Sequence, residues 1–213
     1  MKSFPTLKLE IDLWEKGYTV VGIDEVGRGS FAGPLVVGAV VFHPELNKSY
    51  IKTLESLGIN DSKKLSPKKR ELLTKIIQEK CASLSIEYID HRIINDLGIG
   101  SALKIGFKNI AEQIVSKLPK TKLFFLTDAY KINGIDNSLQ LNIIRGDATS
   151  LSIAAASVVA KVDRDNFMVG QAKLYPDYGF EKHKGYGTLQ HRDMIKLYGP
   201  CPIHRTEFVK NHI

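Results

Sequence analysis

The apolar and polar positions of the chain follow two periods, and these periods predict alternating strands and helices. Short apolar runs rich in Val, Ile, Leu and Phe predict strands at 19–24, 34–43, 82–89, 122–127 and 140–145. Apolar residues that recur every three or four positions predict helices at 8–16, 101–118, 150–163, 164–174 and 188–197, with another that begins at 66. Early strands that then interleave with helices favour an α/β fold with a mixed sheet.

Several of these segments carry further local signals. Ser66 is a typical N-cap and Pro67 a typical first helical residue. The buried stripe of that helix is predicted to be Leu72, Leu73, Ile76 and Ile77. The helix at 101–118 has the clearest amphipathic period, formed by Leu103, Phe107, Ile110, Ala111, Ile114, Val115 and Leu118. Residues 150–163 are rich in alanine, which predicts close packing against another element, whereas residues 48–65 are predicted to be irregular.

The chain shows no internal repeat, no low-complexity segment and no interdomain linker. Its 213 residues are predicted to form one domain, 1–213, because that length fits one large core. Within it, residues 18–174 are predicted to form the core and residues 175–213 a small helical appendage.

Composition adds a basic bias to this picture. The net charge is +7 and the pI is about 9.3. The excess of cations is either a solvated basic surface or the sign of a polyanionic partner, because Lys and Arg release counterions when they bind phosphates.

The cysteines and the apolar runs bear on the compartment. Cys81 and Cys201 lie far apart and form neither a zinc-ligand spacing nor a disulfide framework, so a reducing cytoplasm is expected. The first five residues lack the apolar core of a signal peptide. The longest apolar runs are too short to cross a bilayer, and no membrane association is expected.

Candidate chemistry begins at the end of the first predicted strand. Asp24 and Glu25 are adjacent carboxylates after an apolar run, Asp128 ends the strand at 122–127, and Asp147 follows the strand at 140–145. Strand ends in an α/β sheet often border a crevice. Each single Asp has a simpler explanation, since Asp128 could form a turn and Asp147 could serve the next helix N-terminus. Strict alternation also places Asp24 and Glu25 on opposite faces, so they share a site only where the strand twists or ends.

Four acids around one crevice predict a metal-dependent reaction. Hard cations such as Mg²⁺ or Mn²⁺ favour oxygen ligands and would relieve the repulsion between the carboxylates. Two such ions, roughly 3.5–4 Å apart, could share these side chains, one activating a water and the other stabilising a leaving oxygen. No Ser, Cys or His nucleophile is required.

A glycine-rich loop, Gly27-Arg28-Gly29, follows the first acids directly. Glycines leave backbone N–H groups open to a ligand, and the arginine fits a phosphodiester. The loop also matches the loose G-x-G-x-x-A dinucleotide pattern, but a pyrophosphate site needs a following helix, and residues 34–43 are predicted to be a strand. A plain tight turn is the simplest alternative.

Basic residues near two further motifs could contact a nucleic-acid backbone. The stretch 61–70, which includes Asp61, Ser62 and Lys63, is the densest basic segment. It is either an exposed helix start or a phosphate contact, since cations oppose the dipole at a helix N-terminus. Lys161 and Arg164 could meet the same backbone. Tyr186, between glycines, could stack on a nucleotide or serve as a core or turn residue.

Taken together, these motifs resemble bacterial ribonuclease HII, a type 2 ribonuclease H, over about residues 18–207. The resemblance is carried by the segments 22–29, 61–65, 146–147 with 152–161, 185–188 with His191, and 199–200 with His204 and Arg205.

The resemblance implies a ribonuclease H fold and Mg²⁺- or Mn²⁺-dependent endonucleolytic hydrolysis of RNA paired with DNA. It also implies incision 5′ to single ribonucleotides in duplex DNA, which leaves 3′-hydroxyl and 5′-phosphate ends. The four acids implied are Asp24, Glu25, Asp128 and Asp147. The Gly27-Arg28-Gly29 loop would sense the ribose 2′-hydroxyl, and Tyr186 would stack on a sugar on the DNA side of the junction. Asp61, Ser62 and Lys63 would lie along the substrate path.

One residue departs from the family pattern. The third acid usually sits in an Asp-Gly step, but here Asp128 is followed by Ala129, so the turn is expected to differ. The sister family, ribonuclease HIII, usually has Gly-Thr-Gly where this chain has Gly-Arg-Gly.

Two other functions stay open from the residues. One is a structure-selective DNA nuclease of the same superfamily, and the other is a catalytically silent, basic nucleic-acid-binding module. A monomer is the default expectation for the oligomeric state.

Overall fold

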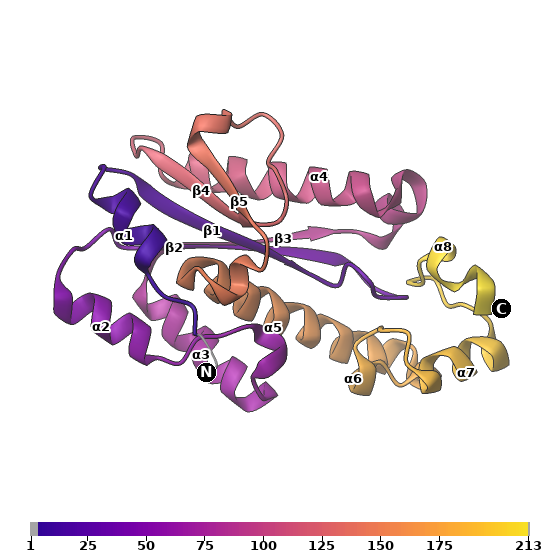
Figure 1. The fold of residues 1–213 in the computed structure, drawn as a ribbon. Helices are drawn as coiled ribbons and strands as arrows, with labels where there is room; N and C mark the ends of the chain where they lie inside the picture. Colours follow the sequence, from indigo (N-terminus) through magenta and orange to yellow (C-terminus); the bar gives the residue numbers. More distant parts are fainter. Residues whose placement is uncertain (1–3, 213) are drawn as a thin grey trace.

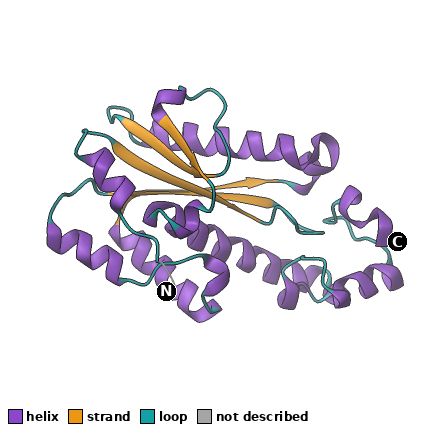
Figure 2. Cartoon of the chain, viewed as in Figure 1, coloured by secondary structure: helices purple, strands orange, loops and turns teal. Residues whose placement is uncertain are grey.

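The computed structural model describes residues 4–212, and a five-stranded mixed sheet lies at its centre (Figures 1 and 2). The strands are β1 (Thr19–Val26), β2 (Leu35–Phe42), β3 (Cys81–Ile89), β4 (Leu123–Asp128) and β5 (Gln140–Ile143), in the order β3-β2-β1-β4-β5. The first three strands are antiparallel neighbours, and β4 and β5 run parallel to β1. The α/β mixed sheet predicted from the apolar runs is therefore confirmed.

Helices cover both faces of the sheet (Figure 1). The helices are α1 (Lys8–Trp14), α2 (Lys48–Ser56), α3 (Pro67–Lys80), α4 (His91–Lys117), α5 (Leu151–Leu174), α6 (Phe180–His183), α7 (Leu189–Tyr198) and α8 (Thr206–Val209). On one face α4 packs against Val21 and Ile23 of β1, while α5 packs with α1 and α3 on the other, around Val20. Short 3₁₀ turns complete the chain: η1 (Ser62–Lys64), η2 (Asn137–Leu139), η3 (Gly146–Ala148), η4 (Pro176–Tyr178) and η5 (Lys210–His212).

Helix α5 lies unusually close to the sheet. A Cβ at Gly22 would lie 2.2 Å from the backbone carbon of Ser152, and one at Gly38 would lie 2.6 Å from the carbonyl oxygen of Ala156. Only glycine on the strands and small residues on the helix allow this approach. The close packing predicted for the alanine-rich residues 150–163 is therefore confirmed, and the sheet is the element against which they pack. This contact brings Ser157 of α5 beside the end of β1.

Helices α6 to α8 gather at the far end of α5 (Figure 1). Their apolar cluster includes Phe180 and Ile195, and it packs on Met168 of α5 and Ala32 of the β1–β2 loop. The C-terminal segment thus touches the loop that begins with Gly27. The division into a core at 18–174 and an appendage at 175–213 stays a prediction.

Five local expectations were wrong, the first being the start of the helix predicted at 101–118, since α4 begins at His91. Residues 48–65 are not irregular, because they contain α2 and η1, with Asn47 capping α2 through its side chain. Only Leu73 and Ile77 of the predicted α3 stripe are fully buried, and Leu72 is exposed. Val115 of α4 is also exposed, since it lies at the edge of the apolar stripe. The helices predicted at 150–163 and 164–174 are one continuous α5.

Candidate active site

The predicted acids meet where β4 leaves the side of β1. The last paired residues of these two strands are Ile23 and Thr127, so the end of β1 keeps only β2 as a neighbour. A cavity of about 520 Å³ opens there. Its lining residues are Asp24, Glu25, Val26, Gly27, Arg28, Gly29, Ser62, Lys63, Asp128, Asp147, Ser157, Lys161 and Tyr186. The structure therefore brings together the four predicted acids and the predicted substrate-contacting residues, except Asp61 and Arg164.

Asp24 and Glu25 reach this cavity from opposite faces of β1. Asp24 is 5 % exposed and belongs to the α5 face, where the Ser157 hydroxyl donates a hydrogen bond to its carboxylate. Burial and the neighbouring Glu25 carboxylate raise the pKa of Asp24 well above its usual range. Burial, with the nearby Asp128 carboxylate, raises the pKa of Glu25 to about 7. Asp24 and Glu25 thus point to opposite faces of β1, as predicted. Both can reach one cavity because β4 no longer pairs with β1 at this point.

Asp128 and Asp147 approach the same point from two other elements. Asp128 ends β4, and its Oδ1 accepts a hydrogen bond from the Gly146 N–H at 2.8 Å, which ties the two acid-bearing turns together. Asp147 lies in η3, and partial burial with the charges of Asp61 and Asp128 raises its pKa. Asp61 therefore acts on the site through Asp147, although it does not line the cavity.

The chemistry of the cavity fits a divalent cation. The Asp128 charge helps to raise the pKa of Asp24, Glu25 and Asp147, so the acids lie close enough to disfavour one another's ionisation. Glu25 Oε2 is buried and has no hydrogen-bond partner among the described residues, a costly arrangement that a cation would relieve. Among residues 4–212, no group of three or more Asp, Glu, His or Cys side chains is arranged in a way that could hold a metal ion.

The two glycines of the Gly27-Arg28-Gly29 loop differ in their surroundings. Gly27 has φ +88°, and a Cβ there would lie 2.1 Å from Nε of Arg164, so only glycine fits. A Cβ at Gly29 would meet nothing within 4 Å. Arg28 lies over the ring of Tyr130, 5.2 Å from its centroid, and its charge lowers the pKa of Glu25. Gly27 therefore shapes the loop, while Gly29 leaves backbone open beside the acids.

Two buried arginines hold the β1–β2 connection, residues 27–34, by its carbonyl oxygens. Arg164 donates to the carbonyls of Pro34 at 2.9 Å and Ala32 at 3.0 Å, and Arg205 donates to those of Gly33 at 2.9 Å and Arg28 at 3.0 Å. Both side chains are 0 % exposed. Arg164 was expected as a possible contact of a nucleic-acid backbone, but its side chain is fully buried and cannot make that contact.

Ser157 is a functional candidate for which no role was predicted from the sequence. Its hydroxyl lies 3.0 Å from that of Ser62, and it also serves Asp24. It joins the 61–65 segment to the acids through α5. The signal was present, because Ser157 is the only polar residue between Ile153 and Ala160.

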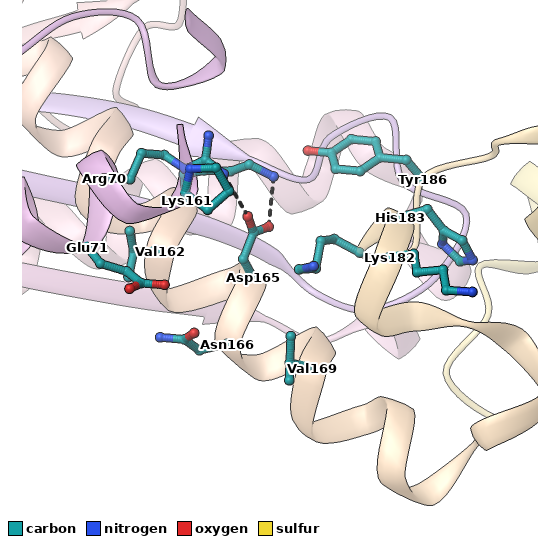
Figure 3. A pocket seen from close by; sticks show the side chains of 12 residues that line it. Arg70, Glu71, Lys161, Val162, Asp165, Asn166, Val169, Lys182, His183 and Tyr186 are labelled. Atoms are coloured by element: carbon teal, nitrogen blue, oxygen red, sulfur yellow. Dashed lines mark hydrogen bonds and ion pairs between the residues drawn. The ribbon is translucent and has the colours of Figure 1, made fainter. Parts of the chain in front are cut away.

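A second cleft, of about 400 Å³, adjoins the acid cavity and shares Lys161 and Tyr186 with it. Figure 3 shows its lining, in which Asp165 lies between Arg70 and Lys161. Lys161 Nζ lies 2.7 Å and Arg70 Nη2 lies 3.5 Å from the Asp165 carboxylate. Lys182 and Lys184 line the same cleft, so cations outnumber the acids Asp165 and Glu71 there.

The dinucleotide interpretation of the glycine loop is contradicted. A pyrophosphate site requires a helix N-terminus after the glycines, but the loop leads into strand β2. Among the described residues, none of the helices is both long and apolar enough to cross a membrane.

Comparison with known proteins identifies the family. A family model described as ribonuclease HII matches residues 21–212. The chain belongs to the ribonuclease HII family. A ribonuclease HII of Acholeplasma laidlawii is 42 % identical over 207 residues, which cover 97 % of this chain and 95 % of that protein. One from Ruminiclostridium cellulolyticum is 46 % identical over 91 % of this chain and 71 % of that protein. Members of the ribonuclease HII family are ribonuclease H endonucleases, and this chain is such an enzyme.

Solved structures of related proteins share the fold. The ribonuclease HII in a complex with PCNA from Archaeoglobus fulgidus gives a TM-score of 0.70 at 24 % identity, over 90 % of this chain and 94 % of that one. A Bst ribonuclease HIII in complex with Mn²⁺ gives 0.64 at 17 % identity, over 86 % of this chain and 63 % of that one. These likenesses confirm the ribonuclease H-like fold expected from the motifs.

Proposed function

We propose that the acid cavity hydrolyses the RNA strand of RNA/DNA hybrids and incises duplex DNA 5′ to single ribonucleotides, leaving 3′-hydroxyl and 5′-phosphate ends. The observation that carries this proposal is the convergence of Asp24, Glu25, Asp128 and Asp147 on one cavity, beside a loop with open backbone at Gly29. The family's endonuclease activity needs such a cavity to hold a phosphodiester.

Two divalent cations, Mg²⁺ or Mn²⁺, are the proposed cofactors, and the four carboxylates would hold them. Bound there, such ions supply a water nucleophile near neutral pH and stabilise charge on the leaving oxygen. Ser157 keeps the Asp24 carboxylate oriented through its hydrogen bond. Lys63 lowers the pKa of both Glu25 and Asp147, so it lies near enough to attract a phosphate at the cavity mouth.

Recognition of the ribose would fall to the Gly27-Arg28-Gly29 loop. Arg205 holds the Arg28 carbonyl of this loop, Arg164 holds the Ala32 carbonyl that follows it, and Gly29 has no side chain to keep a sugar away. A 2′-hydroxyl can donate and accept at the same point, which a backbone amide group can read. Lys161 and Tyr186 would contact the strand beyond the acids, since both also line the cleft of Figure 3.

Cleavage of a duplex with one ribonucleotide, in the presence and absence of Mg²⁺, tests the proposal. Wild-type enzyme should nick it 5′ to the ribonucleotide only with metal, and Asp24→Asn should lower the rate by at least about 10³-fold while binding is retained. Asp12→Asn, on the exposed side of α1, is the matched control and should cleave normally. Undiminished turnover by Asp24→Asn would contradict the proposal.

The same assay separates the alternatives. An all-DNA junction cleaved in preference to the ribonucleotide duplex would indicate a structure-selective DNA nuclease. Binding of hybrid that survives neutralisation of all four acids, with no cleavage by the wild type, would indicate a silent binding module. We further propose a monomer that works in the cytoplasm, where the unpaired thiols of Cys81 and Cys201 would stay reduced.

A further inference from the structure

A chain of two buried histidines ends on the backbone of Tyr186. His191 Nε2 lies 3.0 Å from His204 Nε2, and His191 Nδ1 lies 3.0 Å from the Tyr186 carbonyl oxygen. His191 is fully buried and His204 is 3 % exposed. Both belong to motifs that carry the family resemblance, and no role was predicted for either from the sequence.

The neighbours of the two rings decide where the protons lie. His204 Nδ1 lies 2.8 Å from the Cys201 nitrogen and 3.1 Å from the Cys201 carbonyl oxygen, so the Tyr186 carbonyl, which can only accept, fixes the order. His191 Nε2 must then accept from His204 Nε2, and His204 Nδ1 accepts from the Cys201 N–H. His191 then carries its proton on Nδ1 and donates to the Tyr186 carbonyl. The reverse placement would set a lone pair of His191 against that carbonyl oxygen.

Burial keeps both rings neutral. It lowers the pKa of His191 and that of His204 to about 4, so at neutral pH each ring carries the single proton that the chain requires. His183 stacks on His191 with ring centroids 4.4 Å apart, and its Nδ1 accepts a hydrogen bond from the Gly185 N–H. His183 and His191 therefore form hydrogen bonds with backbone groups on both sides of the Gly185–Tyr186 peptide.

The turn itself is sharp and sets the direction of Tyr186. Lys184 and Gly185 both have positive φ, +54° and +82°, and a Cβ at Gly185 would lie 2.5 Å from the Ala32 carbonyl oxygen. Beyond this turn the Tyr186 ring lies beside Lys161, whose Nζ is 5.2 Å from the ring centroid, at the shared wall of the two cavities. Figure 3 shows the ring between Lys161 and His183.

We propose that His191, oriented by His204, is a positioning residue that fixes the Tyr186 peptide and so holds the tyrosine ring against the substrate strand. This inference rests on the proposed function, because it takes Tyr186 as a substrate contact. The histidine pair acts through the tyrosine and touches no substrate itself.

Paired substitutions separate hydrogen bonding from packing. At position 191 the Asn amide nitrogen stands where Nδ1 was, so His191→Asn keeps the donor to Tyr186, whereas His191→Gln places its amide at Nε2 and loses that donor. We expect His191→Gln to lower kcat/KM on the one-ribonucleotide duplex roughly tenfold and His191→Asn less than about threefold. At position 204 the order should reverse, with His204→Gln tolerated and His204→Asn impaired. Because Asn leaves the larger cavity at both positions, an order set by packing alone would favour Gln twice and would overturn the proposal.

A double-mutant cycle with Tyr186→Ala completes the test. If the histidine acts through the tyrosine, His191→Gln should change kcat/KM little once Tyr186 is absent. An equal loss in both backgrounds would overturn the inference. If Tyr186→Ala is impaired and His191→Gln is not, the inference fails while the proposed contact stands. If Tyr186→Ala is fully active, the proposed role of Tyr186 fails first. Urea unfolding of each variant verifies that it is folded, and the position-204 pair decides the matter should a position-191 variant not fold.

Discussion

At the scale of single residues, Ala129 is held in a conformation that suits glycine. It follows Asp128 with φ +60°, and its N–H donates to the Ile143 carbonyl at 3.1 Å. A left-handed conformation costs a residue with a Cβ roughly 1–2 kcal/mol. Ala129, the residue that departs from the family's Asp-Gly pattern, thus lies in a turn that glycine would adopt with less strain.

Replacing this alanine should therefore stabilise the enzyme. Ala129→Gly relieves the backbone strain but adds freedom to the unfolded chain, so we expect a net gain of roughly 0.5–1 kcal/mol in urea unfolding. Ala82→Gly, at an exposed position in β3 with ordinary backbone, is the control and should lose a similar amount. A loss of stability in Ala129→Gly would show that the φ value is not limiting.

Glu25 makes a pH-dependent contribution to stability. Its pKa rises on folding from 4.5 to about 7, so the folded state binds more protons than the unfolded state between these values. Without metal, stability should therefore fall as pH rises from 4.5 to 7 and stay low above it.

Glu25→Gln should remove this penalty. In EDTA at pH 8 it should raise the free energy of unfolding by up to about 3 kcal/mol, and at pH 4 by little, because the wild-type carboxyl is then protonated as well. Mg²⁺ at pH 8 should stabilise the wild type more than the variant, which should also lose cleavage. Glu79→Gln on the exposed side of α3 serves as control. The same gain at both pH values would exclude an effect of the Glu25 charge.

Some residues of the site could be recognised from the sequence, and others could not. Asp24, Glu25, Asp128 and Asp147 were predictable because each follows an apolar run that ends at the same edge of a sheet. Ser157 and Arg205 were not assigned roles, since their partners Ser62 and Arg28 lie 95 and 177 positions away. Arg164 was misplaced for the same reason.

At the scale of elements, the contact of α5 with the sheet determines where the acids lie. Gly22 and Gly38 let the helix approach, and Ser157 of that helix reaches Asp24 as a result. The alanine-rich pattern predicted this close packing. The pattern predicted two helices where α5 is one, because Arg164 in its middle is a charged residue that interrupts the apolar pattern, although it is buried. Helix α2 was missed because only Leu54 of its residues is fully buried.

Gly22→Ala tests this contact directly. Its Cβ would meet backbone atoms of Ser152 and Ile153 at 2.2 and 2.5 Å, and backbone cannot move aside as a side-chain tip can. We expect a loss of about 3 kcal/mol in urea unfolding, since α5 must shift off the sheet. Gly29→Ala should stay within about 0.5 kcal/mol of the wild type, because its Cβ meets nothing. Equal stability of the two variants would contradict the close contact.

At the scale of the whole molecule, the basic bias can now be located. The net charge of +7 fitted either a solvated basic surface or a polyanionic partner, and it did not say where such a partner would lie. Lys161, Lys182 and Lys184 line the cleft that shares Tyr186 with the acid cavity, so the cations extend the proposed site along one direction. The sequence could not show this, because 20 or more positions separate Lys161 from the other two lysines.

If a nucleic-acid backbone follows that cleft, its lysines should set part of the salt dependence of binding. Each phosphate contact contributes about 0.9 to the slope of log K against log salt for duplex DNA. Lys182→Gln with Lys184→Gln, in the Asp24→Asn background to prevent cleavage, should lower the slope for the one-ribonucleotide duplex by about 2. Lys16→Gln with Lys52→Gln removes the same charge at exposed positions beside α1 and in α2, at the opposite end of the sheet (Figure 1), and should leave the slope nearly unchanged. Equal slopes for the two double variants would mean that the cleft binds no phosphate and that net charge alone attracts the duplex.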